Sequence, residues 1–319
     1  MDRRQFLTAA AAPLLLGAAP ALARPSGGTP LALVTADLES SIVAVHLTTG
    51  HVYRRIATPV GPRSIESVKG NAALVAHTGS GRMTLVDSGL GVNPIRGPFG
   101  APRYSAISPD GRFAYATDSE REEVAIVDLR TRRVTRRVPV GGPARHLSLD
   151  PLGRRLWVVL GSKSAEIAIV GLDRPRGPRV VDRVQPPFLA HDVGYEPRGA
   201  QVWVTSGDRG QLALYDDHAT RLIRTISADA PPQHVTFLGG RAFVTSGDDG
   251  VLRVHARDGR LLRSAPVPGG SYNVQQGWGV ILTPSLSRGT LCVFNGRGAR
   301  LRELRVARSS HDSCFVMSP

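Results

Sequence analysis

The stretch "SPDGRFAYATD", residues 108–118, joins a polar turn to an alternating strand. Ser, Pro, Asp and Gly are the residues that tight turns favour, and the alternation that follows them is typical of a half-buried strand. The pair could form a single hairpin, or it could be one copy of a repeated unit. A repeat of this pair at a fixed period would decide the whole fold.

The turn recurs along the chain at nearly constant spacing. Variants such as "SVKG", "DPLG" and "EPRG" precede further strand-like runs, and the intervals between their last glycines are 41, 42, 46, 41 and 39 residues. This period is typical of four-stranded propeller blades. The glycines that end the turns are Gly70, Gly111, Gly153, Gly199, Gly240 and Gly279.

Each repeat contains four short strand-like runs. After the turn come an apolar run such as "AYATD" and a second run such as "VAIVD". An arginine-rich run such as "RVTRRVPVGGP" follows, and then a run such as "RYSAIS". Outside the N-terminus no window sustains a helical period, so the sequence predicts an all-β fold.

The two ends of the chain supply complementary parts of one blade. "LALVTAD", "SIVAVHL" and "HVYRRIATP" provide three strands near the start, and the C-terminal "HDSCFVMSP" provides the missing one. We therefore predict seven blades in a ring, closed by pairing of the C-terminal strand with the N-terminal strands.

The pattern resembles the YVTN-repeat branch of seven-bladed propellers, which is related to lactonase-like and WD40-like propellers. The closest copies are "FAYATD" with "VAIVDLRTRRVTRRVPVGGPARHLSLDPLG", and "VWVTSGDRGQLALYD". The resemblance implies a seven-bladed β-propeller of four-stranded antiparallel blades over residues 31–319. Because propellers include enzymes, binding modules and scaffolds, it implies a fold and no single activity.

The N-terminus resembles an export signal. "MDRRQFLTAAAAPLLLGAAPALARP" has a basic start with Arg3 and Arg4, an Ala/Leu-rich stretch and a small-x-small site before residue 24. We predict a twin-arginine signal peptide over residues 1–23 and a lead-in over 24–30, with a general secretory signal or an uncleaved anchor as alternatives. The mature protein is then periplasmic or secreted and has no transmembrane span.

The charge is strongly positive. The formal net charge is +14, and all basic residues except Lys69 and Lys163 are arginines, many of them on the runs expected to lie outermost. Such a protein attracts anionic partners, which here could be a small molecule, an envelope polymer or a protein. No recognition motif accompanies the charge, so we expect no sequence-specific nucleic-acid binding. We expect a monomer.

Cysteine and nucleophile motifs are few. Cys292 and Cys314 could form a disulfide or remain two buried thiols. There is no C-x-x-C-H, so we expect no covalent c-type haem, and there is no G-x-S-x-G nucleophile elbow.

The candidate site is the ring of polar residues at the starts of the inner strands. Imidazoles, carboxylates and guanidiniums converging there could hold a divalent metal, bind an anion or transfer protons, although such residues can also simply line water. Loops add His77, Asp118, Asp208 and Asp248. The predicted ligand-binding residues are Arg63, Arg103, Arg145, His146, His191, Asp192, Gln233, His234, Tyr272, Asn273, His311 and Asp312.

Three functions are compatible with this ring. The first, which we favour, is an exported binding or scaffold module with an arginine- and histidine-rich channel mouth. The second is a lactonase- or lyase-like enzyme that uses a metal or a histidine base, and the third is a redox propeller with a non-covalent cofactor. From the excess of arginine we expect a net positive cleft that prefers an anion, with carboxylates orienting the histidines.

Overall fold

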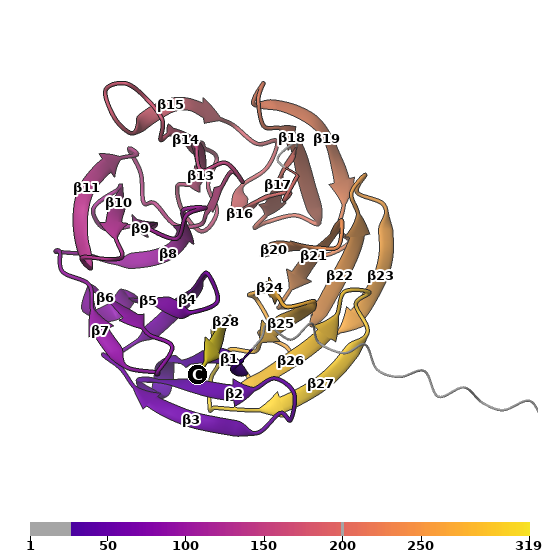
Figure 1. Cartoon of the computed structure of the whole chain (residues 1–319). Helices are drawn as coiled ribbons and strands as arrows, with labels where there is room; N and C mark the ends of the chain where they lie inside the picture. The colour runs from indigo at the N-terminus through magenta and orange to yellow at the C-terminus, as the bar shows by residue number, and fades with distance from the viewer. Residues whose placement is uncertain (1–26, 199–200) are drawn as a thin grey trace, which may run out of the picture.

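The computed structural model of the chain describes residues 27–198 and 201–319. It contains seven four-stranded antiparallel sheets arranged as blades around a central axis (Figure 1), and a cavity lies among their inner strands. The predicted seven-bladed propeller is therefore confirmed. The predicted signal peptide, residues 1–23, lies outside the described residues.

Each blade runs from an inner strand beside the channel to an outermost strand on the rim. The inner strands are β4 (Pro62–Val68), β8 (Pro102–Ile107), β12 (Leu147–Leu149), β16 (Ala190–Tyr195), β20 (Val235–Leu238), β24 (Gln275–Gly277) and β28 (Ser313–Ser318). The second strands are β5 (Ala72–His77), β9 (Phe113–Asp118), β13 (Arg155–Val159), β17 (Gln201–Ser206), β21 (Arg241–Ser246), β25 (Val280–Pro284) and β1 (Thr29–Ala36).

Basic runs lie on the outermost strands, as expected, except in the blade that ends in the short strand Val92–Pro94, which has no basic residue. The third strands are β6 (Arg82–Val86), β10 (Glu123–Asp128), β14 (Ile167–Gly171), β18 (Gln211–Asp216), β22 (Val251–Ala256), β26 (Thr290–Asn295) and β2 (Ser41–His46). The outermost strands are β7 (Val92–Pro94), β11 (Arg133–Pro139), β15 (Arg179–Val184), β19 (Arg221–Ser227), β23 (Leu261–Pro266), β27 (Arg300–Arg305) and β3 (Val52–Ala57).

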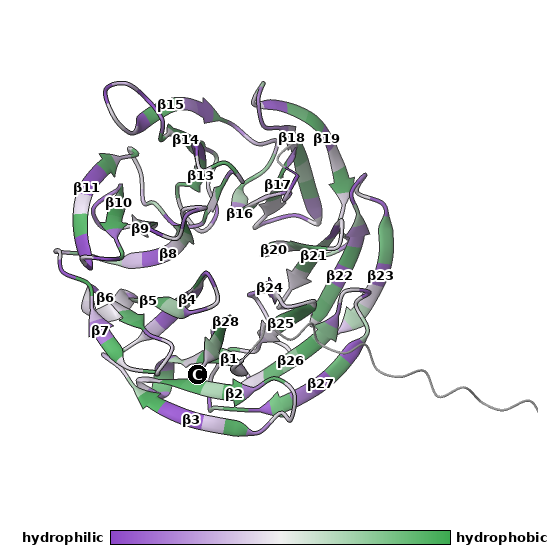
Figure 2. Cartoon of the chain, in the orientation of Figure 1, coloured by the Kyte–Doolittle hydropathy of each residue, from purple (hydrophilic) through white to green (hydrophobic). Residues whose placement is uncertain are grey.

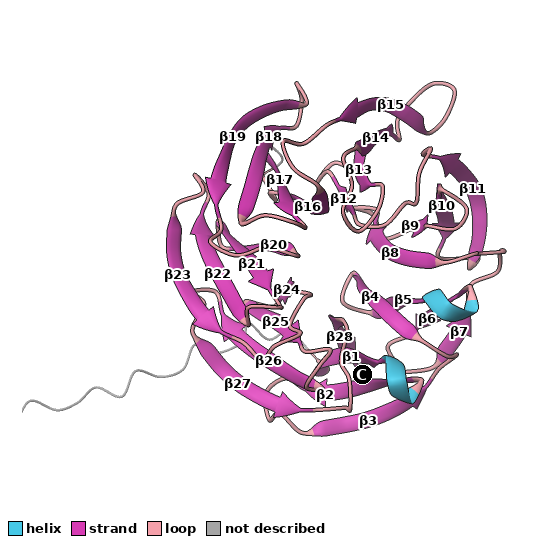
Figure 3. Ribbon diagram, turned by 180° about the vertical axis from the view of Figure 1, so that it is seen from behind, coloured by secondary structure: helices cyan, strands magenta, loops and turns pink. Residues whose placement is uncertain are grey.

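Helix is nearly absent from the part of the chain that the structure describes. Two single-turn 3-10 helices, η1 (Asp37–Glu39) and η2 (Thr78–Ser80), follow β1 and β5 (Figure 3). Among the described residues, no helix is long and apolar enough to cross a membrane.

The turn in the opening stretch explains why the motif repeats. Gly111 has a φ of +74° and donates its N–H to the Ser108 carbonyl at 2.8 Å, while the Ser108 hydroxyl accepts the Phe113 N–H at 2.8 Å. Glycine adopts this left-handed conformation without a Cβ clash. Gly153 ends the next copy with a φ of +71° and the same kind of bond, to the Asp150 carbonyl at 2.9 Å. Each turn reverses the chain between the inner and second strands.

The ring closes as the sequence predicts. The C-terminal strand β28 is the inner strand of a blade whose other strands are β1, β2 and β3. It pairs with β1 in antiparallel register from Thr29 opposite Ser318 to Val34 opposite Ser313. Both edges of β1 are therefore hydrogen-bonded.

The hydrophobic core lies between the blades. Seven clusters of buried apolar side chains occupy the seven blade-to-blade interfaces, and Trp157 and Trp203 are the largest fully buried residues. Hydrophilic and hydrophobic segments alternate along the outermost strands, as on β3 and β11 (Figure 2). Cys292 and Cys314 are buried free thiols.

Candidate metal centre

Buried threonines on the second strands fix the starts of the inner strands. Thr205 on β17 accepts the Asp192 N–H at 2.9 Å and donates to the Gln233 carbonyl of the next blade at 2.7 Å. Thr117 on β9 forms the same two bonds, with Tyr104 at 3.0 Å and with the Arg145 carbonyl at 2.6 Å. These bonds hold equivalent residues of successive blades at matching heights in the channel.

The strand register defines two layers of residues at this end of the channel. The mouth layer consists of Arg63, Arg103, Arg145, His191, Gln233, Tyr272 and His311, and the second layer of Ser64, Tyr104, His146, Asp192, His234, Asn273 and Asp312. In β16 the register shifts between Ala190 and Val193, the segment that carries His191 and Asp192. Register shifts of this kind re-aim side chains. The inner strands β4 and β8 carry similar shifts, between Pro62 and Ser64 and between Pro102 and Ser105.

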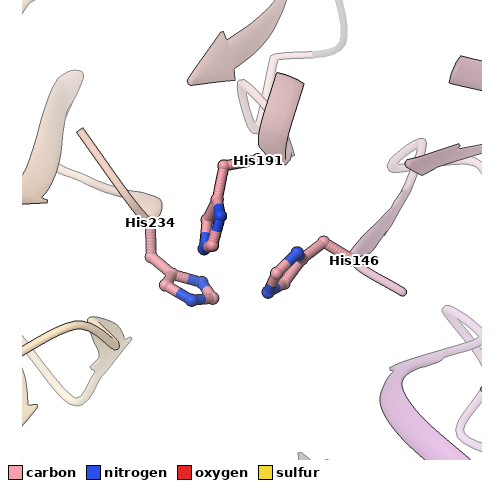
Figure 4. A group of neighbouring side chains, drawn as sticks. All are labelled: His146, His191 and His234. Carbon is pink, nitrogen blue, oxygen red and sulfur yellow. The ribbon is translucent and has the colours of Figure 1, made fainter. Parts of the chain in front are cut away.

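Three histidines from three consecutive blades converge in the channel. The imidazoles of His146, His191 and His234 point toward one another (Figure 4), and one potential ligand atom from each lies within 4.8 Å of the others. Their ring centroids are 4.6 to 5.4 Å apart. All three are among the site residues predicted from the sequence, and the fold brings them together.

Contacts of the Nδ1 atom with a neighbouring oxygen orient two of the imidazoles. The Nδ1 of His191 lies 2.7 Å from the Ser162 carbonyl oxygen, which can only accept, so Nδ1 donates and Nε2 keeps its lone pair. The Nδ1 of His234 lies 3.3 Å from Oδ2 of Asp192. A carboxylate or carbonyl on the far nitrogen is the usual partner of a metal-binding histidine. Asp192 thus contacts a histidine, as expected of the carboxylates in this ring.

Hydrogen bonding offsets little of the burial of His146. Its side chain is about 1% exposed, and neither ring nitrogen has a partner among the described residues. Burial lowers the pKa of His146 well below its usual value and the pKa of His191 to about 4, so both imidazoles are neutral near pH 7. Unpartnered buried nitrogens are costly, and a bound cation would satisfy one of them.

Tyr104 belongs to the site and was not among the predicted residues. Its ring centroid lies 4.2 Å from that of His146 and 5.7 Å from that of His234. Burial raises its pKa, so the phenol stays protonated. A signal existed in the sequence, because Tyr104 follows Arg103 as His146 follows Arg145 in the next repeat.

A cavity of about 180 Å³ lies below the second layer. His146, His234, Tyr104 and Asn273 line its upper part, and Glu66 on β4 lines it further along the channel. Burial raises the pKa of Glu66 to about 7, the effect being reduced by a hydrogen bond from the Ser67 N–H. The cavity therefore places a proton-exchanging carboxyl group in the channel that the histidines enter.

The mouth-layer arginines differ in their partners. Arg63 lies 3.7 Å from a carboxylate oxygen of Asp37. Arg103 donates from Nε to the Ser119 hydroxyl at 3.0 Å, and neither it nor Arg145 forms an ion pair within the described ranges. Burial is the main cause that lowers the pKa of Arg103, and the positive charges of Arg145 and Arg63 lower it further.

Other predicted residues hold the blades together. Asp312 accepts the Ile65 N–H of the next blade at 3.1 Å and its neighbour's N–H at 2.8 Å, and burial raises its pKa. His311 lies with Nδ1 2.7 Å from the Arg63 carbonyl, and Asn273 donates to the His311 carbonyl at 2.7 Å. These groups lie in the same layers as the histidine triad but are engaged by protein atoms.

The loop residues are engaged in the same way. Asp248 accepts from the Tyr272 hydroxyl at 2.7 Å and from the Gln233 side-chain amide at 3.3 Å. Asp118 accepts the N–H groups of the segment before β8, and His77 contacts the Thr84 hydroxyl at 2.9 Å. Asp208 accepts from the Ser206 hydroxyl within its own loop. None of these contacts includes the triad.

Comparison with known proteins identifies the fold. No protein-family model matches the sequence, and a search of curated proteins gives no match. Among solved structures, the chain is similar to apo AztD from Citrobacter koseri, with a TM-score of 0.72 and 10% identity over 92% of this chain and 99% of that one. It is also similar to NirN, a dihydro-heme d1 dehydrogenase solved with DHE, with a TM-score of 0.63 and 14% identity over 90% of this chain and 76% of that one.

A third similar structure is the β-propeller domain of Cps50 (Swd1) from Myceliophteria thermophila. Its TM-score is 0.64, with 16% identity over 76% of this chain and 86% of that one. The comparisons confirm the propeller fold that the repeat pattern implied. Identities this low do not transfer a function from these proteins to this chain.

Proposed function

We propose that this chain is a metal-binding propeller that holds one divalent transition-metal ion, best matched by Zn²⁺, on His146, His191 and His234. The observation that carries the proposal is the convergence of three imidazoles, two of them nearly fully buried, within 4.8 Å of one another. Two of them have Nδ1 placed against an oxygen, which leaves Nε2 available for the metal.

The donor set selects the class of ion. Imidazole nitrogens suit zinc, copper, nickel and iron, whereas magnesium and calcium prefer oxygen ligands. In a tetrahedral zinc site neighbouring nitrogens are about 3.4 Å apart, from Zn–N bonds of about 2.0–2.1 Å. On binding the ion, the ligand nitrogens of the three rings would therefore move closer to one another by about 1 Å. Three protein ligands leave a fourth position open, as in catalytic zinc sites.

An enzyme is the second candidate, and the cavity below the triad favours it. A zinc ion with an open position lowers the pKa of a bound water, and Glu66 and Tyr104 line the adjacent cavity as possible proton donors. Lactone or ester hydrolysis is the reaction class that matches these groups. A zinc-loaded protein that opens simple lactones, and loses this activity but not its zinc when Glu66→Gln is made, would support catalysis.

An exported location agrees with this proposal. The N-terminal sequence predicts passage through the twin-arginine route, which carries proteins that have already folded, and a ring closed by its two termini is suited to folding before export. Replacing Arg3 and Arg4 with Lys should then retain the protein inside the cell.

Metal titration tests the proposed centre directly. We expect one equivalent of zinc per chain in the wild type by calorimetry and elemental analysis, and none in the His146→Ala or His234→Ala variants. The matched control is His51→Ala, because His51 is exposed and lies outside the channel. Zinc binding that is equal in all four proteins, or absent from the wild type, would refute the proposal.

A further inference from the structure

We propose that the channel mouth also binds a small oxyanion, which takes the fourth position on the metal and is held by the guanidinium groups of Arg103 and Arg145. This inference rests on the proposed metal centre and names the ligand that completes it. Acetate-like carboxylates and phosphate share the chemistry required, since each can give one oxygen to a metal and others to arginine.

Charge balance is the first argument for an anion. A divalent ion on three neutral imidazoles keeps its full double charge, and Arg103 and Arg145 add two more positive charges in the mouth layer. Asp192 is the carboxylate that contacts the triad, at 3.3 Å from His234. Uncompensated charge is costly in a partly buried site, so an anionic ligand there is strongly favoured.

The surroundings of Arg145 are the second argument. Arg145 immediately precedes His146, and its Nε is buried without a hydrogen-bond partner among the residues that the structure describes. It is half-buried and forms no ion pair within those residues. The Thr117 hydroxyl donates to the Arg145 carbonyl at 2.6 Å, which fixes the backbone of Arg145 at the channel mouth directly beside the residue that joins the triad.

Arg103 supports the same site from the neighbouring blade. It occupies the same register position as Arg145, and its Nε is bound to the Ser119 hydroxyl, which leaves its terminal N–H groups available. The arginines of the outermost strands differ, because residues such as Arg54 are exposed to solvent on the rim. An oxyanion between Arg103, Arg145 and the metal would relieve the repulsion among three cations.

Cobalt spectroscopy can separate metal binding from anion binding. The probe is the full-length protein loaded with Co²⁺, with perchlorate as the only counter-ion, titrated with acetate, phosphate or chloride while the visible bands are recorded. The variants are Arg103→Gln, Arg145→Gln and Arg145→Lys. The lysine keeps the positive charge but lacks the planar pair of N–H donors of a guanidinium. Arg54→Gln is the control, and thermal melting confirms that each variant is folded.

We expect acetate or phosphate to shift the cobalt bands of the wild type and of Arg54→Gln with equal affinity. Each Gln variant should bind that anion about tenfold or more weakly, and Arg145→Lys should be intermediate. Cobalt affinity without added anion should not fall in the Gln variants, because a repelling charge has been removed.

Two results would overturn the proposal, and they are distinguishable. Cobalt binding with anion affinities that are equal in the wild type and the Gln variants, or equal for chloride and the oxyanions, refutes the oxyanion site and leaves the metal centre intact. Failure of the wild type to bind cobalt refutes the metal centre and the oxyanion site together.

Discussion

Two identical dipeptides, His191–Asp192 and His311–Asp312, acquire different roles from their neighbours. Both aspartates occupy the second layer and accept a backbone N–H from the following blade, from Val235 in one case and Ile65 in the other. The second-layer residue of that following blade is His234 beside Asp192 and Ser64 beside Asp312. Only Asp192 therefore contacts an imidazole of the triad.

Asp192→Asn tests this difference at a single atom. The amide can still accept the Val235 N–H, but it no longer places a negative charge 3.3 Å from His234. Loss of such a carboxylate typically weakens metal binding by about 10- to 100-fold. The measurement is the zinc dissociation constant by competition with a chelating dye.

Asp312→Asn is the matched control for that change. It alters an equivalent carboxylate that also accepts a backbone N–H, and it should leave zinc affinity unchanged. If both variants lose zinc affinity equally, the effect comes from blade packing, and Asp192 has no specific role at the metal.

At the scale of strands, threonines that recur at one position of the sequence repeat fix the geometry of the site, because they hold the starts of the inner strands. The runs "FAYATD", "VWVTSGD" and "RAFVTSGDDG" place Thr117, Thr205 and Thr245 at one position, and each bonds backbone atoms of two blades. In the β12–β13 blade the same position is Val159, which is buried among apolar residues. The strand β5 also has no threonine, and the Thr283 hydroxyl on β25 has no partner among the described residues. Several blades thus form without this bond, and Thr117, Thr205 and Thr245 use it to hold the mouth layer in theirs.

Thr205→Val should lower the free energy of unfolding by about 1–3 kcal/mol, because two buried backbone groups lose a partner while the side-chain shape is kept. Thr205→Ser retains the hydroxyl and should recover most of that stability. Urea unfolding of the metal-free proteins measures both. A valine variant as stable as the wild type would show that these bonds contribute little to the ring.

The sequence predicted the elements well and the site only in part. Turn spacing and strand alternation are local signals, so the four strands of each blade and the closing strand β28 could be read from the repeat. Which of the polar side chains at the strand starts meet depends on the residue at the same position in the next blade, which is His234 beside Asp192 and Ser64 beside Asp312. Those contacts separate the triad from His311 and Asp312, and no local pattern encodes them.

At the scale of the whole molecule, the ring buries two kinds of ionisable group, whose effects on stability have opposite signs as the pH changes. Burial lowers the pKa values of five histidines, to about 4 for His77 and His191, to about 3 for His311, and in direction for His146 and His255. Burial raises the pKa values of two carboxyl groups, to about 7 for Glu66 and in direction for Asp312. Unfolding returns all of them to ordinary values.

Metal-free protein should become more stable as the pH rises from 4.5 to 6.5. In that window unfolding adds protons to the five histidines, whose ordinary pKa is 6.5, and removes them from the two carboxyl groups. Net uptake of protons by the unfolded chain means that acid favours unfolding. Urea unfolding in the presence of a chelator, at several pH values, measures this dependence, and a flat or falling curve would contradict it.

Glu66→Gln isolates the opposing carboxyl group. Because the pKa of Glu66 is higher in the folded state than its ordinary 4.5, ionisation costs stability above pH 4.5, and this cost is fully present above pH 7. The variant should be more stable than the wild type at pH 8, and the difference should shrink as the pH falls toward 4.5. A difference that is independent of pH would show that Glu66 is not held in the folded state as a carboxylic acid.

X-ray absorption at the zinc edge of the zinc-loaded protein tests the central claim most directly, because it reports the atoms bound to the metal. The triad predicts three imidazole nitrogens at about 2.0–2.1 Å and one oxygen ligand, with no sulfur. The His146→Ala variant, which should bind no zinc, should give no three-imidazole signal. A wild-type spectrum dominated by oxygen ligands, or one that includes sulfur at about 2.3 Å, would contradict a metal centre built from His146, His191 and His234.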